Sequence, residues 1–257
     1  MRNILLTIEY DGSAFSGWQR QKGLRTGQGA IEEALEKLLG EKIEINGTSR
    51  TDAGVHALCQ KATFSGDFRI PTGNIKRALN DILAKDRKNL IRITDVKEVP
   101  MDFHARFNSL GKKYRYIIDL DEEPSIFKRN YQWQLPEKLD VNLMGEALQY
   151  IEGTHDFAAF QAQGGTPRKT TVRTIYKAEI FEEDKKVVLE VKGDGFLYNM
   201  VRIIVGTLVE VGKGKIKPAE VKNIIESKDR TTAGPTAPPE GLYLAEIYFD
   251  QEELWKE

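Results

Sequence analysis

Residues 28–40 read QGAIEEALEKLLG, and the period of this stretch decides the fold of the first part of the chain. The apolar side chains recur at helical spacing, at Ile31, Ala34, Leu35, Leu38 and Leu39. Positions i, i+3, i+4, i+7 and i+8 lie on one face of an α-helix, which a core can cover. Gly40 then supplies a stop signal. We therefore predict an amphipathic helix over 28–40.

Strands and a second helix are predicted on both sides of this stretch. The first half is expected to hold strands at 3–10, 43–46, near 58–65 and near 90–99, a loop at 47–56 and a helix from about 72 to 84. This order, β-α-β-β-α-β, is the ferredoxin-like split motif. The second half repeats it, with a strand at 113–120, a helix at 141–151, a hairpin of 173–181 and 187–192, helices from 196 to about 211 and at about 218–227, and a final strand at 241–249.

The element order predicts an α+β protein made of two ferredoxin-like halves, residues 1–106 and residues 107–257. No linker rich in proline or glycine separates the halves, so we expect them to pack on each other. A cleft between them is then the default place for a binding site.

Composition excludes several classes of protein. The chain has 257 residues, of which 40% are hydrophobic and 30% charged, as in ordinary globular proteins and unlike disordered, collagenous or coiled-coil chains. The longest apolar stretch, 197–211, is broken by Asn199, Arg202 and Glu210, so no membrane segment is expected. The N-terminus lacks the features of a signal peptide, and the single cysteine, Cys59, suits a reducing cytoplasm.

Basic residues are segregated although the net charge is only −1. Three stretches without any acidic residue carry cations: 18–28 with Arg20, Lys22 and Arg25; 103–116 with Arg106, Lys112, Lys113 and Arg115; and 161–178 with Arg168, Lys169, Arg173 and Lys177. If these stretches meet in space, they form a phosphate-binding face. The alternative is that each is merely a set of solvated cations.

The loop of residues 48–56, TSRTDAGVH, is the densest candidate for chemistry. The carboxylate of Asp52 lies next to the small residues Ala53 and Gly54, which let a ligand approach, and near the cation of Arg50. The alternative is an aspartate that only initiates a turn.

Arg202 belongs to a helical stretch whose apolar stripe includes Leu197, Met200 and Ile204. A guanidinium at the border of such a stripe is expected to be partly buried and to need an anionic partner, for which Gly206 would leave room. The alternative is that the side chain extends to solvent.

Residues 113–116, KYRY, alternate at strand period, so Tyr114 and Tyr116 share one face and the cations the other. Aromatic faces can stack on bases while the cations hold phosphates. The alternative is two core tyrosines with a solvated opposite face.

Metal, thiol and nucleotide chemistry find little support. The histidines, His56, His104 and His155, are not spaced as helical metal ligands, and we expect no metal site. A nucleophilic pair of Cys59 and His56 is conceivable, but the strand position of the cysteine favours a core residue. No GxxxxGK[ST] or GxGxxG motif is present, so no nucleotide cofactor is expected.

Taken together, these motifs resemble the tRNA pseudouridine synthase A family from end to end. The matching segments, in order, are EYDG at 9–12, GWQRQ at 17–21, RTDAGVH at 50–56, DFHARF at 102–107, YRY at 114–116, FL at 196–197, MVR at 200–202, KDR at 228–230 and GLYL at 241–244. Two departures are visible: Ser49 stands where glycine is common, and Gly27 where an apolar residue is usual.

This resemblance implies a cytoplasmic isomerase that converts uridines at tRNA positions 38, 39 and 40, in the anticodon stem-loop, to pseudouridine without a cofactor. It implies two ferredoxin-like halves whose antiparallel sheets join, an active-site cleft between them, and a homodimer. Asp52 would be the essential catalytic residue.

The substrate-binding residues follow from the same resemblance. Arg202 would be the counter-ion of Asp52, Tyr114 would pack on the target base, and Leu197 would support that base. Arg50 would help to hold the nucleotide after it leaves the stack. Two alternatives stay open at this point: a non-catalytic RNA-binding protein that uses the same basic, aromatic cleft, and a hydrolase that uses Asp52 with His56 or a metal.

Overall fold

The structure is a computed structural model that describes residues 1–85, 90–165 and 169–256. Arg168, a member of the third basic stretch, lies outside the described residues. The chain divides into two compact units, one of residues 1–110 with 243–257 and the other of residues 111–242. The sequence placed the boundary after residue 106 and assigned residues 243–257 to the second half, whereas the structure groups this last segment with the first unit.

The sheet of the first unit is built around β1 (Arg2–Tyr10), which pairs antiparallel with β3 (His56–Gly66) and β4 (Ile91–Val99). On its other side β3 pairs in parallel with β10 (Leu242–Tyr248), where Tyr243 lies opposite His56. This parallel pairing departs from the antiparallel sheet that the sequence predicts, and it explains why the last segment belongs to the first unit.

The strand expected at 43–46 is reduced to β2 (Asn46–Gly47), which pairs with β3. The reason is local. The backbone N–H of Ile45 donates to the carboxylate of Glu32, and its C=O accepts from the amide of Gln28. Because side chains take both backbone groups of Ile45, this residue does not enter the ladder.

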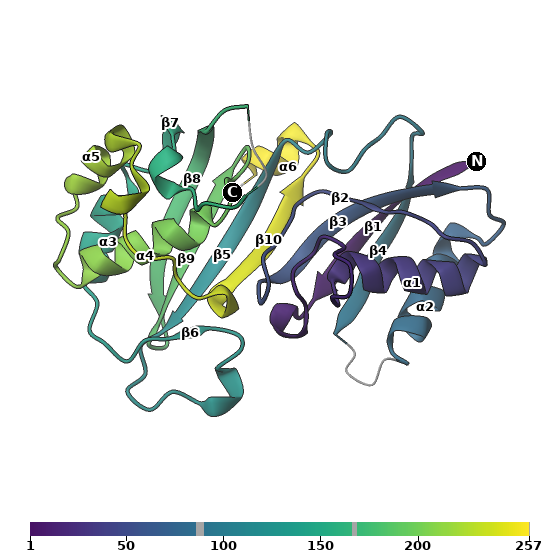
Figure 1. The fold of residues 1–257 in the computed structure, drawn as a ribbon, viewed down its shortest axis with the longest axis horizontal. Coiled ribbons are helices and arrows are strands. Elements are labelled where there is room, and N and C mark those ends of the chain that lie inside the picture. Colours follow the sequence, from purple (N-terminus) through teal and green to yellow (C-terminus); the bar gives the residue numbers. More distant parts are fainter. Residues whose placement is uncertain (86–89, 166–168, 257) are drawn as a thin grey trace. The chain divides into compact units, whose positions relative to one another are not determined.

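Two helices complete the first unit, α1 (Gly27–Leu39) and α2 (Thr72–Leu83), which pack against each other, with α2 also on β4 (Figure 1). The Oγ1 atom of Thr26 caps the start of α1 by accepting from the Gly29 N–H, and Gly40 ends it in the left-handed conformation with φ of 79°. Both predicted helices are therefore confirmed. Their buried apolar residues are Ile31, Ala34, Leu35, Ile75 and Leu79.

The second unit has a sheet in the order β5-β9-β8-β7, all antiparallel neighbours: β5 (Gly111–Asp119), β9 (Lys186–Gly193), β8 (Val172–Glu183) and β7 (Gly153–Asp156). A short strand, β6 (Trp133–Gln134), runs parallel to β5. The predicted hairpin is confirmed, since β8 and β9 are joined at Asp184 and Lys185, whose φ values of 48° and 60° suit a tight two-residue turn.

Helices α3 (Val141–Leu148) and α4 (Met200–Gly212) pack together in the second unit, and α3 also packs on β8 (Figure 1). The predicted start of α4 at residue 196 is wrong. Asn199 adopts a left-handed conformation with φ of 60°, so the regular helix begins only after it. Most of α4 is buried, as its apolar sequence predicts.

The remaining helices are short: α5 (Glu220–Ser227), α6 (Gln251–Trp255) and the 3-10 turns Gly12–Ala14, Ile126–Lys128, Ala158–Phe160, Arg230–Thr232 and Pro239–Gly241. None of the described helices has the length and apolar character that a membrane span requires. The fold is α+β with two ferredoxin-like halves, as the element order predicts. In sequence, the strands of the second half begin with β5 and end with β10.

Candidate active site

The loop between β2 and β3, which carries Asp52, lies against the backbone of residues 9–21. A Cβ atom on Gly12 would lie 2.0 Å from the carbonyl oxygen of Val55, and one on Gly17, where φ is 89°, would lie 2.7 Å from that of Thr51. The Trp18 N–H donates to the Thr51 carbonyl at 3.1 Å. Glycine is therefore required at both positions for the loop to sit where it does.

Neutral side chains also hold this loop. Gln60 is fully buried on β3, donates from Nε2 to the Ser49 carbonyl at 2.6 Å and accepts from the Ser49 N–H at 3.3 Å. The hydroxyls of Tyr10 and Thr51 lie 2.5 Å apart, and Thr48 Oγ1 donates to the Lys61 carbonyl at 2.9 Å. These contacts give the loop a fixed backbone.

Asp52 is half-buried in this loop, with Ala53 exposed beside it. Its carbonyl oxygen accepts from the Val55 N–H at 3.2 Å, and Gly54 completes the turn with φ of 82°. The residue thus opens a turn, as one alternative proposed, but through its main chain. The main-chain role of Asp52 in this turn is compatible with a chemical role of its side chain.

His56 supports the loop through its ring. The Nδ1 atom accepts from the Gly12 N–H at 3.0 Å, and the ring stacks on Tyr243 with centroids 4.8 Å apart. A carboxylate oxygen of Asp11 lies 3.4 Å from the same Nδ1, but an atom that accepts a hydrogen bond carries no proton there. We therefore interpret the Asp11 contact as a close approach rather than an ion pair, and His56 as a structural residue.

Cys59 is half-buried on β3. Burial raises the pKa of its thiol, which is the opposite of what an activated nucleophile needs. The nucleophilic pair of Cys59 and His56 is therefore not favoured. In residues 1–85, 90–165 and 169–256, no cluster of three or more His, Cys, Asp or Glu side chains could hold a metal ion.

The tyrosines of β5 lie on one face of the strand, as predicted. Tyr114 is buried and meets the ring of Phe196 edge to face at 5.0 Å. Tyr116 is fully buried and donates to the Pro238 carbonyl at 2.7 Å. Burial, together with the nearby Glu240, raises the pKa of the Tyr116 hydroxyl well above its usual range. Tyr116 is thus a core residue, which agrees with the alternative for this member of the pair.

Two cations of β5 that the sequence assigns to phosphates, Lys113 and Arg115, form ion pairs within the sheet. The Arg115 guanidinium lies 2.5 Å and the Lys113 ammonium 3.5 Å from the carboxylate of Glu190 on β9. A similar pairing occurs in the first unit, where Arg20 contacts Glu32 and Glu44, each at 2.9 Å. Acidic residues distant in sequence thus compensate cations of two basic stretches.

Arg202 is half-buried on α4, as predicted, and its guanidinium is anchored by neutral oxygens. Nε donates to the Ala237 carbonyl at 2.6 Å and Nη1 to Asn199 Oδ1 at 2.9 Å. The prediction that Gly206 leaves room for an anionic partner is wrong. A Cβ atom there would lie 1.8 Å from the Pro235 carbonyl oxygen, so the missing side chain accommodates the backbone of that segment.

The structure distributes the predicted site residues over the two units. Arg50 and Asp52 share one loop of the first unit, where the Nε of the exposed Arg50 donates to Gln19 Oε1 at 3.0 Å. Tyr114, Leu197 and Arg202 belong to the second unit, and Leu197 is buried just before α4.

Comparison with known proteins decides the family. A family model described as tRNA pseudouridine synthase matches residues 6–108 and 147–250. The chain is 51% identical to tRNA pseudouridine synthase A of Acetivibrio thermocellus, over 97% of this chain and 100% of that protein. It is 50% identical to the protein of the same name from Ruminiclostridium cellulolyticum, over 97% and 100% of the two chains. The chain belongs to the tRNA pseudouridine synthase A family.

Membership of this family sets the reaction: the synthase is an isomerase that converts uridine in tRNA to pseudouridine. Among solved structures, a Cbf5-Nop10-Gar1 complex aligns with 82% of this chain and 55% of that chain at 14% identity. Its TM-score of 0.33 is too low to bear on the fold.

Sequence reasoning missed some residues that shape the site of this synthase. Gln60 clamps the loop, yet a glutamine in a predicted strand gives no sign that it is buried. The motifs at 9–12 and 17–21 contain two more residues of this kind, Gly12 and Gly17. Their glycines had a detectable signal, since a glycine close to a functional loop often permits close backbone approach.

Proposed function

We propose that this synthase isomerises uridines at positions 38, 39 and 40 of the anticodon stem-loop of tRNA, with Asp52 as the essential catalytic residue. The observation that carries the proposal is the construction of the 48–56 loop. Gly12, Gly17 and Gln60 hold its backbone, and Asp52 sits half-buried beside small residues that admit a ligand. A carboxylate held in this way is preorganised for chemistry.

The reaction breaks the bond between ribose and the base nitrogen, turns the uracil and forms a carbon–carbon bond. The hydrogen on carbon 5 of the base leaves as a proton, and the nitrogen released from ribose takes one up, so atoms balance without a cofactor. Asp52 takes part as the ionised carboxylate. We propose that Arg202 is its counter-ion, which would keep the carboxylate ionised at neutral pH.

The other residues would bind the target nucleotide. We propose that Tyr114, whose ring is already fixed against Phe196, packs on the base, and that Leu197 supports the base from another side. Arg50 would help to hold the nucleotide after it leaves the stack, at a cost of about a few kcal/mol for unpairing. The three basic stretches would supply much of the affinity through phosphates of the tRNA, which predicts weaker binding at high salt.

The setting of the enzyme is part of the proposal. We expect it to act in the cytoplasm as a homodimer, with the anticodon arm of tRNA as its partner and without a nucleotide cofactor. Sedimentation of the purified synthase with and without tRNA measures the oligomeric state, and a monomer in both samples would contradict the homodimer.

Tritium release tests the catalytic assignment. Unmodified tRNA labelled at carbon 5 of uridine is incubated with the wild type and with Asp52→Asn at equal occupancy of RNA. We expect release by the wild type and a loss of at least about a thousandfold in the variant, because the change removes the charge that the reaction needs while keeping the shape of the side chain. Thermal melting should be unchanged.

The matched control is Asp67→Asn, which makes the same chemical change at an exposed position of the same unit and should keep full activity. Transcripts that retain uridine at only one of positions 38, 39 and 40 then map the product. Normal release by Asp52→Asn would refute its catalytic role. If the wild type and Asp52→Asn both bind tRNA and neither releases label, the RNA-binding alternative is favoured.

A further inference from the structure

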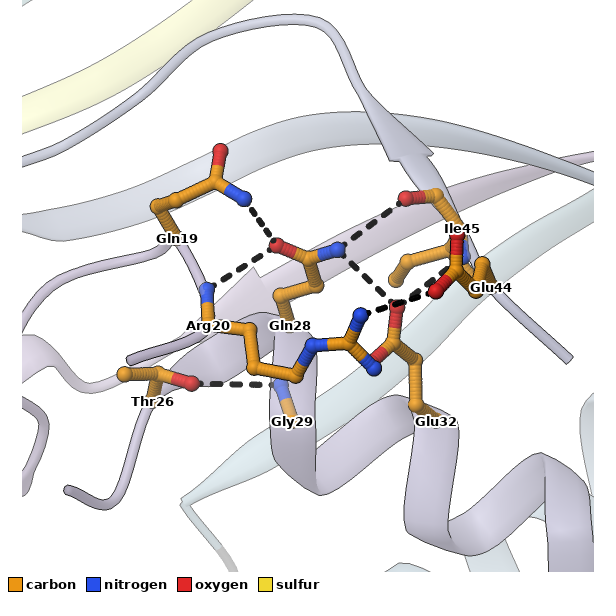
Figure 2. A network of polar contacts seen from close by, with 8 residues as sticks. All are labelled: Gln19, Arg20, Thr26, Gln28, Gly29, Glu32, Glu44 and Ile45. Carbon is orange, nitrogen blue, oxygen red and sulfur yellow. Dashed lines mark hydrogen bonds and ion pairs between the residues drawn. The ribbon is translucent and has the colours of Figure 1, made fainter. Parts of the chain in front are cut away.

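Two glutamine side chains connect the Asp52 loop to a buried carboxylate on α1. Arg50 Nε donates to Gln19 Oε1 at 3.0 Å, and Gln19 Nε2 donates to Gln28 Oε1 at 2.9 Å. Gln28 Nε2 in turn donates to Glu32 Oε1 at 2.9 Å. Figure 2 shows the Gln19–Gln28–Glu32 part of this line at the start of α1. The chain of donors runs in one direction, from the guanidinium to the carboxylate.

The groups at both ends fix this direction. A guanidinium only donates hydrogen bonds and an ionised carboxylate only accepts them, whereas each glutamine amide can do either. Glu32 therefore turns the Nε2 of Gln28 toward itself, which leaves Oε1 of Gln28 to face Gln19. Flipping either amide would set two donors or two acceptors against each other, so a single arrangement satisfies the whole line.

The carboxylate end of the line is rigid. Gln28 and Glu32 are both buried on α1, and Glu32 also accepts from the Ile45 N–H at 3.1 Å and from Arg20 Nη1 at 2.9 Å. Gln28 Oε1 accepts a second hydrogen bond, from the Arg20 N–H at 3.0 Å (Figure 2). Gln28 Nε2 donates a second one, to the Ile45 carbonyl at 3.2 Å. These contacts prevent the Gln28 amide from turning over.

The Gln19 side of the line differs, because Gln19 and Arg50 are both exposed. An exposed hydrogen bond of this kind contributes little to the free energy of folding. We therefore expect the Gln19 amide to orient the Arg50 guanidinium rather than to stabilise the core. The buried residues Gln28 and Glu32 determine that the Gln19 amide presents its oxygen, and not its nitrogen, to Arg50.

We propose that Gln19 is a positioning residue for Arg50, and that Gln28 and Glu32 fix the orientation of its amide. The inference rests on the proposed function, in which Arg50 holds the nucleotide that has left the stack. Gln19 keeps one edge of the guanidinium occupied through Nε, so that the remaining N–H groups point in a defined direction before the RNA arrives. Preorganisation of this kind raises the rate rather than the affinity.

A double-mutant cycle with single-turnover tritium release tests the proposal. We expect Gln19→Ala to lower the rate at saturating tRNA by about tenfold, the size of one hydrogen bond to a charged group. The dissociation constant for tRNA should stay within about twofold, because phosphate contacts supply most of the affinity. Thermal melting should be unchanged, since the side chain is exposed.

The decisive arm is the double variant. Because Gln19 acts through Arg50, the combination of Gln19→Ala with Arg50→Ala should be no slower than Arg50→Ala alone. Gln21→Ala is the matched control: it removes an exposed glutamine from the same loop whose Nε2 donates to the Ser16 carbonyl. We expect wild-type rates for this variant.

Three results would overturn the inference: wild-type rates for Gln19→Ala, wild-type rates for Arg50→Ala, or a further tenfold loss when Gln19→Ala is added to Arg50→Ala. Failure of the proposed function is recognised separately, from the wild type alone. A wild-type protein that binds tRNA without releasing label would refute the isomerase assignment before any glutamine variant is compared.

Discussion

Arg50 and Arg202, the two arginines of the proposed site, are anchored in different ways. Each donates through Nε, but Arg50 donates to the side chain of Gln19 and Arg202 to the main-chain carbonyl of Ala237. Arg50 is exposed on a loop of the first unit, whereas Arg202 is half-buried on α4 of the second.

This difference separates activity from stability. A side-chain acceptor on the surface can be removed by one substitution without disturbing the fold. A backbone acceptor can be moved only by moving the segment that contains it, and residues 235–237 lie directly against α4, where Gly206 meets Pro235. Changes to the backbone acceptor of Arg202 should therefore reach the stability of the whole unit, whereas removal of the Gln19 acceptor of Arg50 should affect the reaction alone.

The largest effect on stability is expected from Gly206→Ala. The new methyl group would lie 1.8 Å from the Pro235 carbonyl oxygen. The other nearest atoms also belong to the backbone of residues 235–237, so no flexible side chain can move aside. We expect a loss of about 3 kcal/mol in the free energy of unfolding, measured by urea denaturation. Activity should fall as well, because the acceptor of Arg202 is displaced.

Gly73→Ala is the control for this change, since a methyl group on that helical glycine of α2 would contact nothing within 4 Å. It should leave stability unchanged or raise it by up to about 1 kcal/mol. Wild-type stability of Gly206→Ala would show that the 235–237 segment does not depend on this close contact.

An intermediate effect is expected from Gln60→Met, which removes the side-chain clamp on Ser49. The loss of hydrogen bonds at a fully buried site should cost about 1 to 2 kcal/mol of stability. The single-turnover rate should drop at a temperature where the variant is still fully folded, because the Asp52 loop loses its fixed backbone.

The matched change for this test is Gln134→Met in the second unit, where Nε2 also donates to a main-chain carbonyl, that of Ser125, but on the surface. We expect its stability to change by less than about 0.5 kcal/mol and its rate not at all. Equal rates for the two variants would mean that the clamp does not serve the reaction.

The smallest effect at neutral pH is expected from Tyr116→Phe. The substitution removes the hydrogen bond to Pro238 and should cost about 1 kcal/mol. At high pH this difference in stability between the wild type and the variant becomes smaller. Because the folded state raises the pKa of this hydroxyl, the unfolded chain loses the proton first, near pH 10, and wild-type stability falls as the pH rises above that value.

Denaturation at pH 7 and at pH 11 measures this difference. Tyr116→Phe lacks the ionisable group, so the wild type should lose more stability than the variant between the two values, and the gap between them should narrow. A gap that widens at pH 11 would contradict the buried, protonated state of the hydroxyl.

Elements with a clear period were predictable from the sequence. The helix at 28–40 and the hairpin of β8 and β9 were found because their apolar spacing and turn residues are local properties. The expected strand at 43–46 and the expected start of α4 at 196 were wrong because single residues decide them. Ile45 is captured by side chains of α1, and Asn199 adopts a left-handed conformation that no period reveals.

The candidate site was predictable to a similar extent. The loop with Arg50 and Asp52 was recognisable from its composition and its motif, and the partial burial of Arg202 from the stripe beside it. The partners were not predictable, since Gln28 and Glu32 on α1 are glutamine and glutamate residues that a helix usually exposes. Their burial depends on the approach of Ile45, which is a tertiary contact.

The pairing of β10 with β3 also determines the order in which the protein can be completed. Tyr243 and Leu244 leave the ribosome only after the whole of residues 111–242, yet they pair with His56 and Ala57 near the Asp52 loop. Contacts so distant in sequence form late, because a long stretch of chain must first be ordered or looped out. During synthesis the first unit is therefore incomplete until the second unit has been made. Until then, β3 lacks its β10 partner at His56 and Ala57.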